Sequence, residues 1–156
     1  MLDLDPLVPL ATRVVETAIA RGVMLSTAES CTGGLVAGLL TSIAGSSAVV
    51  DRGFVTYSNT AKAEMLGVDT RVIDRVGAVS RDVAVAMAEG ALGRTGVPAP
   101  ASEAAAVSVT GIAGPGGATP GTPVGLVHLA VAARDGRITH KECRFGAVGR
   151  NNVREQ

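Results

Sequence analysis

Between residues 26 and 34 the chain reads Ser26-Thr27-Ala28-Glu29-Ser30-Cys31-Thr32-Gly33-Gly34. These residues join residues 23–27, a short and largely apolar run typical of a buried strand, to residues 32–43, whose pattern predicts a helix. A turn of this kind can hold a side chain at the edge of a rigid sheet, facing the free N–H groups at the start of the helix. The stretch therefore predicts an α/β fold and places two candidate nucleophiles, Ser30 and Cys31, at one turn.

Strands and helices continue to alternate on both sides of this turn. The patterns predict helices at residues 6–20, 60–66, 70–76 and 80–92, a linker at residues 97–101, and strands at residues 48–57, 104–109, 124–132 and 137–145. The last two strands flank Arg134-Asp135-Gly136, which predicts a hairpin. We expect one domain over residues 1–156, a three-layer α/β/α sandwich with a mixed, mostly parallel sheet. A helix beginning near Asn151 is cut short at Gln156, so we expect a truncated C-terminal helix.

The composition argues against several classes of protein. Lys and Arg number 14 and balance 14 Asp and Glu, and aromatic residues make up 2% of the chain, so neither a basic field nor stacking platforms for nucleic acid are expected. Cys31 and Cys143 lie far apart and form no zinc-ligand spacing, which predicts no metal and a reducing, cytoplasmic location. No apolar run reaches the roughly 18 residues of a membrane-spanning helix, so no membrane anchor is expected.

Ser30 is a candidate nucleophile, because the backbone N–H groups of residues 32–34 could stabilise an oxyanion beside it. The alternative is that Ser30 simply caps the following helix. A nucleophilic serine needs a base, and the usual base is histidine. His128 and His140 both fall within predicted strands without an acidic residue placed to orient them, which makes them poor candidates.

Lys62 is the better candidate for the base. It follows Tyr57-Ser58-Asn59 in a second predicted turn from strand to helix, which a parallel sheet could bring beside Ser30. A buried lysine can be neutral and act as a base, although a lysine at this spacing is also commonly solvated. Tyr57 could hydrogen-bond within such a site or cover core surface. Cys31 remains an alternative nucleophile if the helix terminus lowers its pKa, or it is an inert buried thiol.

The segment Thr110-Gly111-Ile112-Ala113-Gly114-Pro115-Gly116-Gly117 follows a predicted buried strand and is rich enough in glycine to let the backbone approach a ligand. It matches neither a Walker loop nor a dinucleotide fingerprint. It is either a phosphate or substrate cradle or a tight structural loop. Arg150 and Arg154 could clamp a phosphate or carboxylate, although arginines in such a position are commonly solvated.

Five motifs occur in an order and spacing that resemble the CinA C-terminal domain family. They are Ala28-Glu29-Ser30-Cys31-Thr32-Gly33-Gly34, Tyr57-Ser58-Asn59 with Lys62, Leu66-Gly67-Val68, the glycine-rich segment 110–117, and Pro123-Val124-Gly125. The resemblance covers nearly the whole chain. Because the chain begins with the first predicted helix, it resembles the stand-alone form of the family, without a preceding molybdopterin-binding-like domain.

The resemblance implies a nicotinamide-nucleotide amidase of pyridine nucleotide salvage, which converts nicotinamide mononucleotide to nicotinic acid mononucleotide and ammonia. It implies Ser30 as the nucleophile, Lys62 as the general base, and Tyr57 and Thr110 beside the reacting amide, with neither a metal nor an organic cofactor. A small-molecule nucleotide and further copies of the chain are the expected partners. The candidate substrate contacts are Cys31, Thr32, Gly33, Gly34, Gly111, Gly114, Gly116, Gly117 and Arg150.

One departure from the family pattern lies near the end of the chain. Where the family often has Gly-Asp-Arg, this sequence has Val148-Gly149-Arg150. Two alternative hypotheses therefore stand beside the amidase. One is a nucleotide-sensing or partner-binding module of the same fold without turnover, and the other is a thiol hydrolase that uses Cys31.

Overall fold

The computed structural model describes residues 2–98 and 101–156, so positions 99 and 100 of the predicted linker lie outside the described residues. Its centre is a five-stranded sheet in the order β2-β1-β3-β4-β5. The strands are β1 (Val23–Glu29), β2 (Val50–Val55), β3 (Glu103–Gly111), β4 (Leu126–Ala133) and β5 (Ile138–Arg144). β1 pairs in parallel with β2 and β3, whereas β4 is antiparallel to both β3 and β5. β5 therefore runs in the same direction as β1, β2 and β3, and the predicted mixed sheet and hairpin are confirmed.

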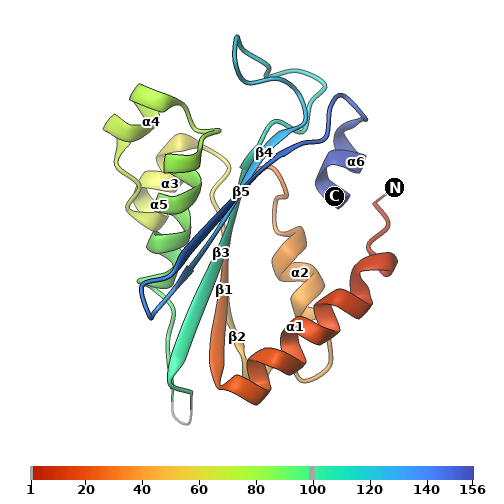
Figure 1. Ribbon diagram of the computed structural model, residues 1–156, viewed down its shortest axis with the longest axis vertical. Coiled ribbons are helices and arrows are strands. Elements are labelled where there is room, and N and C mark those ends of the chain that lie inside the picture. The colour runs from red at the N-terminus through yellow and green to blue at the C-terminus, as the bar shows by residue number, and fades with distance from the viewer. Residues whose placement is uncertain (1, 99–100) are drawn as a thin grey trace.

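Helices cover both faces of this sheet (Figure 1). Helices α1 (Val8–Arg21) and α2 (Leu35–Thr41) pack on one face, and α3 (Asn59–Leu66), α4 (Thr70–Val76) and α5 (Arg81–Leu92) on the other. The short helix α6 (Arg150–Glu155) lies on the side of α1 and α2 and ends close to the N-terminus, where the Asp3 N–H donates to Glu155 Oε1 at 2.9 Å. The predicted three-layer sandwich is therefore confirmed.

Side-chain caps define where three of these helices begin. Ser58, Asp69 and Ser80 precede α3, α4 and α5, and the side-chain oxygen of each accepts a hydrogen bond from a backbone N–H of the first turn. Gly22 ends α1 in the left-handed conformation, with φ at 62°, and its N–H bonds back to the last turn. Residues that the sequence pattern predicted as helix boundaries thus act as caps.

Two predicted elements differ most from the structure. The helix predicted for residues 32–43 begins only at Leu35, because Gly33 and Gly34 have φ values of 64° and 100°, which no right-handed helix contains. The strand predicted for residues 48–57 is β2, which covers Val50–Val55 and follows a 3-10 turn at Ser46–Ala48. The irregular backbone after Ser30 is therefore longer than predicted, and so is the segment that leads into β2.

The sheet brings three chain segments together at one edge. Because β1, β2 and β3 are parallel, their carboxyl ends meet there, and backbone bonds extend the ladder past each strand. The Ser30 N–H donates to Val109 O at 2.9 Å, and the Thr56 N–H donates to Glu29 O at 2.8 Å. The residues that follow the three strands are therefore held on a rigid frame.

Beneath this edge, α5 lies close against the middle of the sheet. Ala84 and Ala88 of α5 pack on Ala130 and Ala132 of β4, and these small side chains let the helix approach the strand closely. On the same face Met87 is fully buried. The frame below the carboxyl edge is thus tightly packed.

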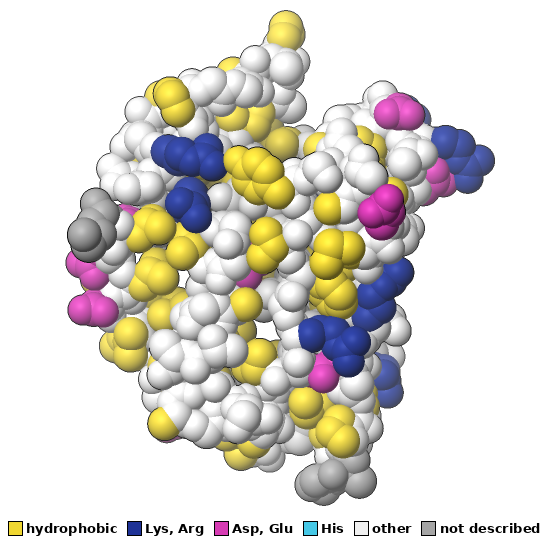
Figure 2. Space-filling model, turned by 180° about the vertical axis from the view of Figure 1, so that it is seen from behind, with side chains coloured by type: hydrophobic (Ala, Val, Ile, Leu, Met, Phe, Trp, Pro, Cys, Tyr) yellow, Lys and Arg dark blue, Asp and Glu magenta, His cyan; other side chains and the backbone are white. Residues whose placement is uncertain are grey.

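The surface shows no single dominant charge on the face drawn in Figure 2. Acidic and basic side chains lie there in small separate groups, with hydrophobic side chains between them. This distribution matches the balance of 14 basic and 14 acidic residues in the sequence. Within residues 2–98 and 101–156, none of the helices is both long and apolar enough to cross a membrane.

Candidate active site

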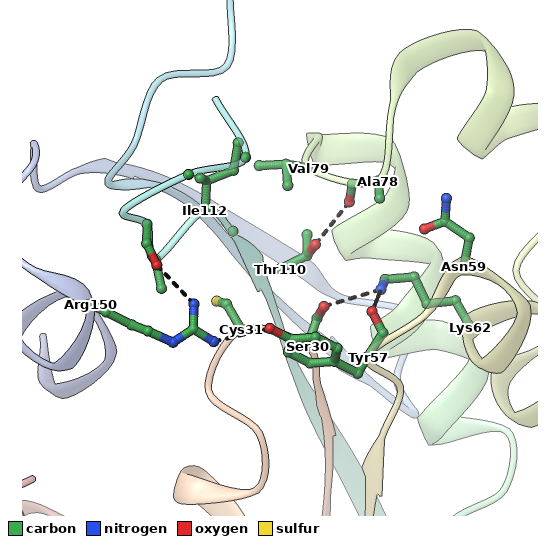
Figure 3. A pocket seen from close by; sticks show the side chains of 15 residues that line it. Ser30, Cys31, Tyr57, Asn59, Lys62, Ala78, Val79, Thr110, Ile112 and Arg150 are labelled. Atoms are coloured by element: carbon green, nitrogen blue, oxygen red, sulfur yellow. Dashed lines mark hydrogen bonds between the residues drawn. The ribbon is translucent and has the colours of Figure 1, made fainter. Parts of the chain in front are cut away.

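A pocket of about 250 Å³ opens at the carboxyl ends of β1, β2 and β3 (Figure 3). Its walls come from the turn after β1, the start of α3, the loops before α5 and after β3, and the start of α6. Among the residues chosen from the sequence, those that line it are Ser30, Cys31, Tyr57, Lys62, Thr110, Gly111, Gly114, Gly116, Gly117 and Arg150. Thr32, Gly33 and Gly34 do not line it. The pocket therefore gathers residues that are up to 120 positions apart in sequence, from Ser30 to Arg150.

Ser30 and Lys62 are in direct contact inside this pocket. Lys62 Nζ lies 3.1 Å from Ser30 Oγ, 2.9 Å from the carbonyl oxygen of Thr56 and 3.4 Å from that of Tyr57. A neutral amine has two N–H groups and one lone pair. The two carbonyl oxygens can accept the two N–H groups of a neutral Lys62, which leaves its lone pair free to accept from the Ser30 hydroxyl.

Burial favours this neutral form of Lys62. The side chain is 1% exposed, and this desolvation lowers the pKa of the ammonium, while the nearby thiol of Cys31 acts weakly in the opposite direction. In the part of the chain that the structure describes, no carboxylate forms a salt bridge with Lys62. The site thus places a hydroxyl beside an amine whose proton affinity is reduced by burial.

The cap of α3 explains why Lys62 points at Ser30. Ser58 Oγ accepts the Ala61 N–H at 3.0 Å, which starts the helix at Asn59 and places Lys62 in its first turn. Long side chains on a helix lean toward its N-terminus, here toward the ends of β2 and β1. The same cap puts the side chain of Asn59 into the pocket, a lining residue for which the sequence reasoning proposed no role.

Thr110 presents an acceptor to the pocket. It is 1% exposed, and its hydroxyl donates to the carbonyl oxygen of Ala78 at 2.8 Å. Because the proton is committed to Ala78, the remaining lone pairs of Thr110 Oγ1 can only accept a hydrogen bond.

The wall formed by Ala78 and Val79 was missed from the sequence, because neither side chain carries a chemical group that marks a site.

Arg150 connects two walls of the pocket. Its Nη1 donates to the carbonyl oxygen of Gly114 at 2.9 Å, and its Nη2 donates to Tyr57 Oη at 3.0 Å. The guanidinium has five N–H groups, so these two bonds leave three for a ligand. Tyr57 is 62% exposed beside it, and its ring stands at the mouth of the pocket. No Asp or Glu is among the described residues that line this space, which suits an anionic ligand.

The glycines in the loop after β3 differ in how much space surrounds them. A Cβ at Gly111 would lie 2.9 Å from Leu126 O, and one at Gly114 would lie 2.7 Å from a methyl of Val124, so packing alone requires both. A Cβ at Gly116 would meet nothing within 4 Å. Packing therefore does not explain Gly116, which remains open to a role in ligand binding.

The turn after β1 departs from the expected oxyanion arrangement. The Gly33 N–H donates to Ser30 O at 3.1 Å, and the Gly34 N–H donates to Glu29 Oε2 at 2.9 Å. Glu29 also accepts the N–H groups of Val36 and Ala37, so this buried carboxylate caps α2 from the neighbouring strand. The structure thus removes Gly33 and Gly34 from the expected set of free donors, since their N–H groups are already occupied.

The other candidate groups are placed less favourably for catalysis. Cys31 lines the pocket but is 6% exposed, and burial raises the pKa of its thiol to about 11, although Arg154 and Arg150 act in the opposite direction. His128 and His140 hydrogen-bond to each other at 2.9 Å on β4 and β5, and neither is among the lining residues. Across the described residues, no three His, Cys, Asp or Glu side chains are grouped as a metal ion would require.

An α/β sandwich that holds a serine against a buried lysine at the carboxyl ends of parallel strands has the architecture of a hydrolytic enzyme. Comparison with known proteins identifies the family to which the chain belongs. The model of the CinA C-terminal domain matches residues 7–156, and the chain belongs to this family.

Individual relatives and solved structures agree with this assignment. The chain is 50% identical over 151 residues to the nicotinamide-nucleotide amidohydrolase PncC of Escherichia coli strain K12, which covers 96% of this chain and 87% of that protein. It is 50% identical over 143 residues to a CinA-like protein of Anaeromyxobacter dehalogenans, of whose length it spans 33%. The crystal structure of the competence/damage inducible protein CihA from Agrobacterium tumefaciens superposes with a TM-score of 0.91 at 54% identity, covering 99% of this chain and 90% of that one.

Proposed function

We propose that this protein hydrolyses the carboxamide of nicotinamide mononucleotide and releases nicotinic acid mononucleotide and ammonia. The observation that carries the proposal is the contact between Lys62 Nζ and Ser30 Oγ, 3.1 Å apart within the pocket. The name of the relative from Escherichia coli, an amidohydrolase of nicotinamide nucleotides, supports the choice of substrate class. The pocket also holds the guanidinium of Arg150, which suits a phosphate, together with Ser30, which suits attack on an amide.

In the first half of the reaction, Ser30 Oγ attacks the carboxamide carbon while its proton moves to the lone pair of Lys62 Nζ. A C–O bond forms, and the carbonyl π electrons move to the oxygen, giving a tetrahedral oxyanion. The oxyanion then re-forms the carbonyl, the C–N bond breaks, and Lys62 returns the proton to the departing nitrogen, which leaves as ammonia. The product of this half is an ester between the nicotinoyl group and Ser30.

In the second half, water attacks the ester carbon, and Lys62 accepts one of its protons. Collapse of the second tetrahedral intermediate breaks the bond to Ser30 Oγ, which takes the proton back from Lys62. One water is consumed for each amide hydrolysed, and the residues return to their starting protonation states. The two carbonyl oxygens that hold Lys62 keep the amine in place through both halves.

The remaining lining residues take complementary roles toward the substrate. Thr110 Oγ1, which can only accept, receives an N–H of the carboxamide. The ring of Tyr57 covers the pyridine ring, and Arg150 with the backbone of Gly116 and Gly117 binds the 5′-phosphate. For the oxyanion, the backbone N–H of Cys31 is the candidate donor, because Cys31 directly follows Ser30 and lines the pocket, whereas Thr32 does not.

The test is ammonia release from nicotinamide mononucleotide by purified wild type and by Ser30→Ala, Lys62→Ala and Cys31→Ala. We expect turnover by wild type and Cys31→Ala, and a loss of at least about 10³-fold in the other two, because a nucleophile and its base act as a unit. Wild-type rates in Ser30→Ala would reject the nucleophile, and an inactive Cys31→Ala would favour the thiol hydrolase. Nucleotide binding by calorimetry without ammonia would favour the sensing module.

A further inference from the structure

Helix α6 carries two arginines that contact different parts of the molecule. Arg150 lines the pocket and bridges two of its walls (Figure 3). Arg154 does not line the pocket, and its guanidinium donates from Nε to Cys31 O at 3.1 Å and from Nη2 to Thr32 O at 2.9 Å. The fork of Arg154 is therefore occupied by the turn that follows β1, and only Arg150 is placed to contact a ligand in the pocket.

The position of Arg150 depends on what anchors α6. The helix has six residues, too few to be stable without tertiary contacts, and no side chain caps its N-terminus. The segment that leads into it belongs to no helix or strand and includes Gly146 and Gly149, which have φ values of 75° and 99°. Contacts made further along α6 must therefore hold Arg150 in place.

Two side chains anchor α6 to the sheet and to the turn after β1. Val153 is 4% exposed and belongs to the apolar cluster that contains Val109 and Val127 of the sheet. Apolar burial is non-directional, so it holds the helix down without fixing its rotation. Arg154 fixes the rotation, because its planar fork binds two successive carbonyl oxygens, a geometry that a lysine cannot reproduce. The turn is itself held on the sheet, since the Ser30 N–H donates to Val109 O.

We propose that Arg154 is a positioning residue, which holds α6 against the turn after β1 so that Arg150 meets the phosphate of the nucleotide. The two arginines are four positions apart and therefore lie on the same face of the helix. The clamp thus sets the distance between Ser30, which attacks the amide, and the guanidinium that binds the phosphate. The inference rests on the proposed amidase activity and deepens it, because it adds a residue that determines affinity for the nucleotide.

The kinetic test measures KM and kcat for nicotinamide mononucleotide. We expect Arg154→Gln to raise KM about ten-fold, near the effect of losing one hydrogen bond to a charged group, with kcat changed less than about two-fold. Arg154→Lys should raise KM as well, because it keeps the charge but loses the fork. Arg144→Gln is the matched control and should behave as wild type, since Arg144 is exposed on β5 and pairs with Glu142 at 2.7 Å.

A double variant tests whether Arg154 acts through Arg150. Arg150→Gln should raise KM at least as much as Arg154→Gln does, and the two substitutions together should raise it no further. Residues that act through one group are non-additive in this way. Additive increases in KM would show that Arg154 acts independently of Arg150.

A further measurement needs no turnover. Tyr57 is the single tyrosine of a chain without tryptophan, so intrinsic fluorescence reports on the side chain whose Oη accepts from Arg150 Nη2 at 3.0 Å. Arg150→Gln should change this fluorescence in the substrate-free protein. Arg154→Gln and Arg154→Lys should change it in the same direction, and Arg144→Gln should leave it unchanged.

Several outcomes besides additivity would overturn the proposal. They are an unchanged KM in Arg154→Gln, a wild-type KM in Arg154→Lys, wild-type fluorescence in Arg154→Gln, or a fall in kcat that matches the unfolded fraction measured by circular dichroism. Absence of ammonia with wild type would instead reject the amidase. The fluorescence of the substrate-free protein would then still decide whether Arg154 positions Arg150.

Discussion

At the scale of single residues, the proposed chemistry depends on one buried amine. Lys62 is 1% exposed and is surrounded by a hydroxyl and two carbonyl oxygens, without a carboxylate in a salt bridge among the described residues. Such a site disfavours the ammonium form, so the same burial that prepares a base at neutral pH also costs folding free energy when the base is protonated. Function and stability therefore oppose each other at this position.

The first prediction concerns the pH dependence of stability in wild type and Lys62→Met. The pKa of Lys62 in the folded protein lies below its value of 10.5 in the unfolded chain, so the unfolded state binds more protons between these two pKa values. The free energy of unfolding of wild type should therefore rise with pH across that window, by up to about 1.4 kcal/mol per pH unit relative to Lys62→Met. At pH values below the window, the destabilisation caused by burying Lys62 should be complete. Urea unfolding at a series of pH values measures the difference.

A difference between the two proteins that stays constant with pH would show that burial does not perturb Lys62. Lys62→Met also loses the hydrogen bonds to Thr56 and Tyr57, but this loss changes its free energy of unfolding by the same amount at every pH. The pH dependence of activity is a second measurement of the ionisation of Lys62. Since the proposed mechanism uses the neutral amine as the base, kcat/KM should fall as the pH drops below the lowered pKa of Lys62.

At the scale of elements, the site depends on how α2 begins. A carboxylate from β1, and not a residue of the helix itself, accepts three N–H groups at this helix N-terminus. Glu29 therefore joins the strand, the turn and the helix, immediately before the nucleophile in sequence. The favourable interaction of a negative charge with a helix N-terminus adds to these hydrogen bonds.

The second prediction is that Glu29→Gln destabilises the fold and lowers turnover. Gln keeps one acceptor oxygen but turns an NH₂ group toward backbone donors, and it removes the charge. We expect a loss of about 1–3 kcal/mol in the free energy of unfolding. Urea melts measure this loss, and Glu142→Gln on exposed β5 is the control that should change stability by less than about 0.5 kcal/mol. Equal stability of Glu29→Gln and wild type would show that the cap contributes nothing.

The third prediction uses two helical glycines with opposite environments. Gly90 of α5 packs against the end of α3, where an added Cβ would overlap the carbonyl oxygen of Leu66, whereas Gly38 of α2 has nothing within 4 Å of that position. Gly38→Ala should therefore stabilise the protein by about 0.5–1 kcal/mol through helix propensity. Gly90→Ala should destabilise it by about 1–3 kcal/mol, because the overlap outweighs the same propensity gain. Thermal melts that show both variants changing in the same direction would contradict this reading.

These elements also show how far the sequence could predict the structure. The layers and the mixed sheet follow from apolar periodicity, and the nearness of Ser30 and Lys62 follows from their places after two parallel strands. The start of α2 could not be read in this way, because it depends on the left-handed backbone of two glycines and on a carboxylate outside the helix. The contacts of Arg154 were also hidden, since its partners are backbone carbonyls far away in sequence.

At the scale of the whole molecule, the pocket is assembled from nearly the full length of the chain. The segments that follow β1, β2 and β3 supply most of its walls, and α6 closes the side where Arg150 reaches Tyr57 and Gly114. The N-terminal segment contacts the same helix through Asp3 and Glu155, so the two ends of the chain lie close together (Figure 1). A ligand that contacts all these parts should stabilise the molecule as a unit.

The last prediction separates the phosphate from the rest of the ligand by thermal shift. A ligand that binds the folded state at 100 times its Kd adds about 2.7 kcal/mol, which is roughly 5–10 °C in Tm for a chain of this size. Nicotinamide mononucleotide should raise the Tm of Ser30→Ala, which binds without turnover, more than equal concentrations of nicotinamide riboside. Adding Arg150→Gln to Ser30→Ala should remove most of that difference, because Arg150 is the cation assigned to the phosphate, whereas adding Arg144→Gln should preserve it. Equal shifts by the two ligands would place the phosphate outside this pocket and leave Arg150 as a structural bridge between Tyr57 and Gly114.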